Sequence, residues 1–133
     1  MHKLFFSLLA MLMLATTISA QQKVTYPVVV SFNSLCCGVP SNLPVMKLVK
    51  TFKKQYKIKQ VVVDSIGPMG REGEYYLAFR LKEFSKVQKI KFIQQLKKTA
   101  ATMKENGYAE IKENETIDKS SLASRAGIIL LKL

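Results

Sequence analysis

The chain has 133 residues, is 48% hydrophobic, and carries 21 Lys and Arg against 9 Asp and Glu, a net charge of +12. Its one histidine, His2, lies in an N-terminal leader, so a processed chain has no imidazole for acid–base catalysis, Ser-His or Cys-His nucleophiles, or metal ligation. Two adjacent cysteines form no disulfide framework. We therefore expect a small basic protein that is not an enzyme.

The first twenty residues have the pattern of a cleavable signal peptide. Lys3 gives a positive start, residues 4–14 are apolar, and residues 15–20 are small or polar, with Ala20 at the expected cut. The apolar run is too short to span a bilayer comfortably. We expect the protein to be exported to a periplasm or secreted, with residues 21–133 as a single domain.

Strand and helix alternate in the first half of the processed chain. β-Branched and aromatic residues predict a strand over Val24–Phe32. Apolar side chains at helical spacing, with Pro44 in the first turn, predict a helix over Leu43–Tyr56. Two further strands, Gln60–Ile66 and Tyr75–Lys82, are joined by a glycine-rich loop at 67–74.

The second half begins with a capping box at residues 85–88, Ser-Lys-Val-Gln, which predicts a helix running to Asn106. Tyr108–Lys112 is expected as a short strand and Gly127–Leu133 as an apolar last strand. Asn114–Arg125, between them, is expected as a loop or a short helix.

This order, β-α-β-β-α-β with an extra C-terminal strand, resembles the ferredoxin-like split β-α-β fold, an α+β class with both helices on one face of an antiparallel sheet. The right-handed crossover rule places the third strand between the first two and antiparallel to both. Tyr76, Arg80 and Lys82 should then lie on the open face. The last strand either extends a sheet edge or replaces Tyr108–Lys112 as the fourth strand.

The same topology predicts that three loops meet at one end of the molecule. The first loop contains Cys36 and Cys37, and the last precedes Tyr108. The middle loop, 67–74, contains most of the remaining reactive side chains. The predicted site residues are accordingly Cys36, Cys37 and Met69 for a metal, and Arg71, Glu72, Glu74 and Tyr108 for another ligand or an anion.

The adjacent thiols, Cys36 and Cys37, have three interpretations. Two thiolates, with the Met69 thioether nearby, suit a soft ion such as Cu(I). The placement is similar to that in heavy-metal-associated domains, which are ferredoxin-like and carry Cys-x-x-Cys in the first β-α loop. Neighbouring side chains tend to diverge, so joint ligation needs an unusual backbone. The pair could instead be redox-active, helped by a thiol pKa lowered at the following helix N-terminus, or be structural.

The glycine-rich loop and the strand after it suggest two weaker alternatives. Gly67, Gly70 and Gly73 predict a hairpin turn or, with Arg71, a backbone nest for an anion. Residues 71–79 are similar to the strand signature of RNA-recognition motifs, which implies a stacking role for Tyr76. Nucleic acid is nevertheless not the expected partner, because the positive charge is mostly lysine and the chain is expected to be exported.

The expected function is thus a small binding or accessory protein, with thiol-dependent ligand or soft-metal binding at the Cys36-Cys37 loop. The alternatives are a redox-active thiol protein and an interaction protein. The latter would dock on an envelope protein or an anionic membrane surface through its lysine-rich faces.

Overall fold

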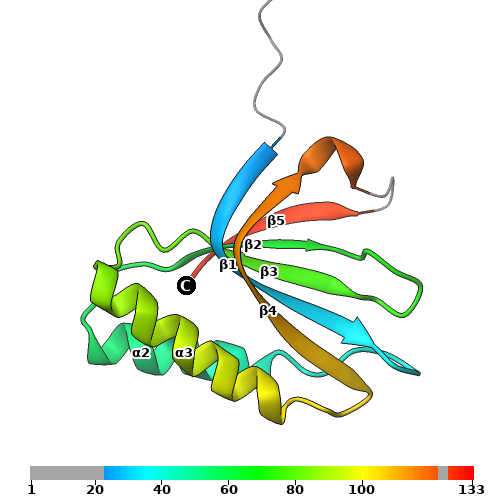
Figure 1. The fold of residues 1–133 in the computed structure, drawn as a ribbon, viewed down its shortest axis with the longest axis horizontal. Helices are drawn as coiled ribbons and strands as arrows, with labels where there is room; N and C mark the ends of the chain where they lie inside the picture. The colour runs from blue at the N-terminus through cyan, green and yellow to red at the C-terminus, as the bar shows by residue number, and fades with distance from the viewer. Residues whose placement is uncertain (1–22, 123–125) are drawn as a thin grey trace, which may run out of the picture.

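The computed structural model describes residues 23–122 and 126–133, so the predicted signal peptide lies outside the described residues. The described chain is α+β, with two α-helices and an antiparallel five-stranded sheet (Figure 1). In chain order the elements are β1 (Lys23–Ser34), α2 (Leu43–Gln55), β2 (Val62–Gly67), β3 (Tyr75–Phe79), α3 (Lys86–Thr102), β4 (Gly107–Asp118), a 3₁₀ turn (Lys119–Ser121) and β5 (Gly127–Lys132).

The strands lie in the order β4-β1-β3-β2-β5. β3 pairs antiparallel with both β1 and β2, which confirms the placement expected from the crossover rule. β4 pairs with β1 along nearly its whole length. β5 pairs with β2 at the opposite edge, so the last strand extends the sheet and does not replace the fourth strand.

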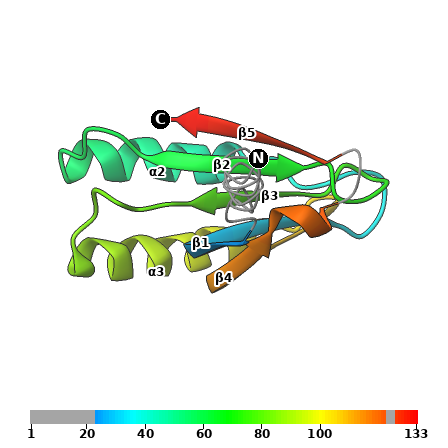
Figure 2. The ribbon, with the colours of Figure 1, turned by 90° about the horizontal axis from the view of Figure 1, so that it is seen from above.

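Both helices pack on one face of the sheet (Figure 2). The buried residues of α2 are Val45, Val49 and Phe52, which belong to the predicted apolar stripe. Ser85 caps α3 with the predicted capping box, in which its hydroxyl accepts from the backbone N–H of Gln88 and the Gln88 side chain accepts from the N–H of Ser85. An aromatic cluster joins the two helices to the sheet through Phe52, Phe79, Phe84 and Phe92.

The other sheet face is less open than expected. A second buried cluster lies there, formed by Tyr26, Val29, Ile66, Ala78 and Ile117. The outer halves of β1 and β4 bend away from the helices (Figure 1) and bring Tyr26 and Ile117 onto this cluster.

The bend in the β1–β4 pair occurs where Pro27 faces Asn114. Proline has no N–H to donate, and Asn114 has a left-handed backbone with φ 51°. The pairing keeps the same register on both sides of this point, from Tyr26–Glu115 to Val28–Glu113. Pro27 lies just beyond the part of β1 that pairs with β3, so the missing donor interrupts only one ladder.

Three predicted ends were wrong by three residues or more. β3 ends at Phe79 and not at Lys82. The strand expected over Tyr108–Lys112 continues to Asp118, so the first part of Asn114–Arg125 is strand and not loop. α3 ends at Thr102 and not at Asn106, although Asn106 does adopt the expected left-handed backbone, with φ 62°. No helix in the described residues is long and apolar enough to cross a membrane.

Candidate functional site

Three loops meet at one end of the molecule, on the right in Figure 1, as the topology predicts. The backbone N–H groups of Leu35 and Cys36 both donate to the carbonyl of Asn106, at 3.1 and 3.4 Å. Gly107 packs so closely on Asn33 that a side chain there would strike its carbonyl. We call this region, formed by residues 35–38, 69–74 and 104–108, the thiol end.

The two thiols face solvent on adjacent residues of the first loop. Cys36 and Cys37 are both exposed, unoxidised side chains. Cys37 has φ 64°, a left-handed conformation that is uncommon for a residue with a side chain, and Gly38 follows with φ 117°. The Cys36 side chain lies near enough to raise the pKa of the Cys37 thiol. The Cys36-Cys37 pair therefore lies on an uncommon backbone.

The surroundings raise the pKa of Cys37 above its usual range. The largest cause is the neighbouring Cys36 side chain, followed by partial loss of water and by the negative charge of Glu72 on the neighbouring hairpin. The expectation that the N-terminus of the following helix lowers a thiol pKa is therefore wrong for Cys37. Cys37 is therefore protonated near neutral pH in the free protein.

The hairpin loop between β2 and β3 keeps its acidic residues in different environments. The Glu74 carboxylate folds back into the loop, where it accepts from the N–H of Glu72 at 3.2 Å and packs on Gly70. Arg71 and Glu72 are exposed. Glu74 therefore shapes the loop, whereas Arg71 and Glu72 are free to meet a ligand.

Met69 and Tyr108 have different relations to the thiols. The Met69 side chain packs on the second buried cluster, the one that contains Tyr26 and Ile66. Tyr108 stands at the start of β4 opposite Asn33, with 44% of its surface exposed. The apolar Leu35, which is 75% exposed, adjoins the cysteines in the chain.

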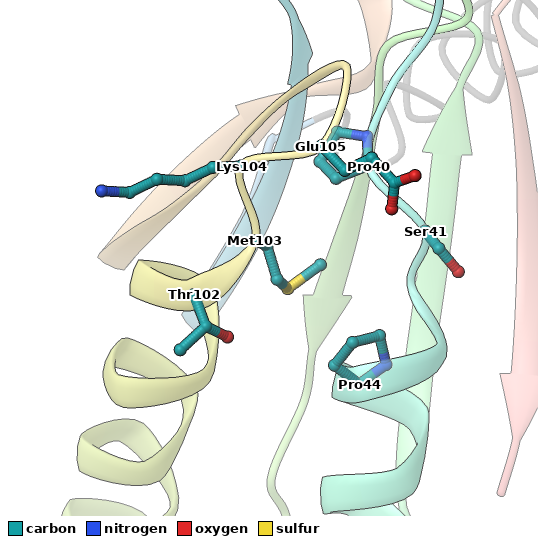
Figure 3. A pocket seen from close by; sticks show the side chains of 7 residues that line it. All are labelled: Pro40, Ser41, Pro44, Thr102, Met103, Lys104 and Glu105. Atoms are coloured by element: carbon teal, nitrogen blue, oxygen red, sulfur yellow. The ribbon is translucent and has the colours of Figure 1, made fainter.

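A hollow of about 140 Å³ opens at the same end, between the start of α2 and the end of α3. Figure 3 shows Met103 between the two helices, with Pro40 and Pro44 on one side and Lys104 and Thr102 on the other. Because Met103 is 5% exposed, the floor of this hollow is apolar. No cysteine lines this hollow, so it is separate from the thiol pair.

A buried polar group that the sequence did not reveal lies on the second sheet face. Asp64 is 1% exposed and accepts two hydrogen bonds from the Arg80 guanidinium, at 2.8 and 3.1 Å, and one from the hydroxyl of Tyr26. Burial and the Asp64 carboxylate raise the pKa of Tyr26. The Arg80 guanidinium is thus paired with Asp64. Asp64 and Arg80 are diagonal neighbours on paired strands, a relation visible only once the register is known.

The composition of the thiol end limits what it can bind. In the described ranges, 23–122 and 126–133, no three His, Cys, Asp or Glu side chains gather in a metal-binding arrangement. Comparison of the chain with protein-family models, with curated proteins and with solved structures gives no significant match.

Proposed function

We propose that this protein is a small exported binding protein that holds a soft monovalent ion, such as Cu(I), between Cys36 and Cys37. The observation that carries the proposal is a pair of adjacent exposed thiols on a left-handed backbone at Cys37, with Cys36 close enough to raise the pKa of Cys37. Thiolates are the ligands that soft ions prefer, and Cu(I) accepts few ligands. We leave Met69 out of the ligand set, because its side chain packs on the second buried cluster.

Binding at this pair would be coupled to protons. Each thiol must lose its proton to ligate, so two protons leave when the ion binds. The raised pKa of Cys37 makes affinity increase with pH across the neutral range. The negative charge of Glu72 opposes the free thiolate and attracts an incoming cation.

A redox role for the pair has less support. Reactive cysteines of thiol oxidoreductases have lowered pKa values, because the thiolate is the attacking species. The pKa of Cys37 is raised. Thiol exchange at Cys37 should therefore be slow.

We also infer that β1 to β4 and the two helices form a ferredoxin-like split β-α-β arrangement to which β5 adds an edge strand. The β4-β1-β3-β2 part of the sheet and the position of both helices on one face support this assignment. Export to a periplasm or secretion remains part of the proposal and rests on the pattern of residues 1–20.

The test is anaerobic titration of the reduced protein with Cu(I), read by native mass spectrometry and by competition with a chromophoric Cu(I) chelator. We expect one ion per chain, lost in the Cys36→Ser/Cys37→Ser variant and weakened in each single variant. Met69→Leu is the matched control and should bind like the parent. Undiminished binding by the double cysteine variant, or no binding by the parent protein, would overturn the proposal.

A further inference from the structure

Charge is segregated between the helix layer and the rest of the described chain. α2 contains four lysines and α3 contains five, and neither helix contains an acidic residue. Four of the nine carboxylates in the chain lie on β4. The lysines of the helix layer are Lys47, Lys50, Lys53, Lys54, Lys86, Lys89, Lys91, Lys97 and Lys98.

These lysines are available for an external partner. Seven of the nine are exposed, and Lys53 and Lys89 are partly buried. Within residues 23–122 and 126–133, Lys97 alone among them forms an ion pair, with Glu113 of β4. A cluster of cations without counter-charges costs stability through mutual repulsion, which an anionic partner would relieve.

The side chains between the lysines indicate the kind of anion. The layer has no arginine, so it lacks the planar fork used to recognise individual phosphates or bases. Its aromatic side chains, Phe52 and Phe92, are buried. Tyr56, which follows α2, is half-buried, and Lys91 lies over its ring at 5.8 Å. The layer therefore offers no open aromatic surface on which bases could stack. These features disfavour nucleic acid.

Three apolar side chains lie exposed among the lysines. Leu43 of α2 and Val87 and Ile90 of α3 are 72, 61 and 58% exposed. Lysines together with exposed aliphatic side chains are typical of helices that lie at a bilayer interface, where the charges meet lipid headgroups and the aliphatic groups enter the acyl boundary. Phe52 and Phe92 pack together at 5.1 Å between ring centres, so the two helices lie side by side (Figure 2).

We propose that the outer face of α2 and α3 docks on a membrane rich in anionic lipids. The face is a layer of two helices, and the acidic strand β4 lies at one edge of the sheet that they cover. Docking this way leaves the thiol end at the side of the contact, because its loops join strand and helix ends. The proposal does not depend on ion binding by the cysteines.

The test is sedimentation of the full processed protein with phosphatidylcholine vesicles, with and without phosphatidylglycerol. Lys50→Glu/Lys98→Glu changes one lysine on each helix. Lys23→Glu/Lys132→Glu is the matched control, because it makes the same change in net charge on β1 and β5. Each lysine near an anionic surface contributes about 1 kcal/mol, so we expect the helix variant to bind at least about thirtyfold more weakly. The control should change binding severalfold less.

Salt and lipid composition decide the remaining outcomes. Raising the ionic strength from about 0.1 M to about 1 M shortens the Debye length from about 10 Å to about 3 Å and should release the protein. Equal loss in the two charge variants, or equal binding to neutral vesicles, would overturn the proposal. So would tight binding to duplex DNA without binding to the anionic vesicles. Circular dichroism of each variant checks that the helices are intact.

Discussion

Replacing Asp64 by alanine should destabilise the protein strongly. Asp64 is the acceptor for three hydrogen bonds, two from Arg80 and one from Tyr26, and is 1% exposed. Breaking a buried ion pair by removing one partner costs about 3–5 kcal/mol. The Arg80 side chain is 33% exposed and can recover some water, so we expect a loss of about 3 kcal/mol, at the lower end of that range.

Urea unfolding followed by circular dichroism measures this loss as a lower midpoint at an unchanged slope. Glu110→Ala is the control, because Glu110 is 54% exposed and meets Lys112 at 3.9 Å; such surface pairs contribute about 0–1 kcal/mol. A loss below about 1 kcal/mol in Asp64→Ala would refute the assignment of Asp64 as a buried anchor. Tyr26→Phe should add little once Asp64 is gone, since both variants remove the same hydrogen bond.

Two further predictions concern the start of α3 and the thiol end. Ser85→Ala removes the hydroxyl that accepts from the N–H of Gln88, and should cost about 1 kcal/mol in the same unfolding assay; an unchanged midpoint would contradict the role of the cap. In a Cys36→Ser background, Glu72→Gln should lower the pKa of Cys37 by removing a negative charge, and so speed its alkylation by iodoacetamide near neutral pH. Glu83→Gln, beyond the opposite end of β3, should leave that rate unchanged, and an equal effect of both variants would contradict the assigned contact.

The order of elements and the meeting of three loops were predictable because both follow from local patterns combined with one topological rule. The alternation over residues 75–81 predicts which side chains of β3 reach the helices, and Leu77, Phe79 and Leu81 are indeed in that core. The capping box at Ser85 is likewise a short-range signal, and it is present in the structure.

The second buried cluster was not predictable, because it depends on a bend that no periodicity encodes. Tyr26 and Val28 are two residues apart on β1, so regular alternation would point both toward the helices. Val28 does face the helices, but Tyr26 packs on the opposite face. The change occurs at Pro27, opposite the left-handed Asn114. An asparagine in a polar stretch predicts a turn equally well, and here the strand continues through it.

The thiol pair also combines a feature that the sequence predicts with one that it does not. Its place beside the hairpin follows from topology, but no pattern in the sequence encodes the left-handed backbone at Cys37. Cys37→Ser removes the sulfur and so cannot test the role of the backbone conformation. Gly38→Ala keeps both sulfurs and changes only the backbone. Gly38 has φ 117° and open space around it, so a methyl group there meets no neighbour and its cost is conformational. If ion binding depends on this left-handed backbone, Gly38→Ala should weaken it with both cysteines in place.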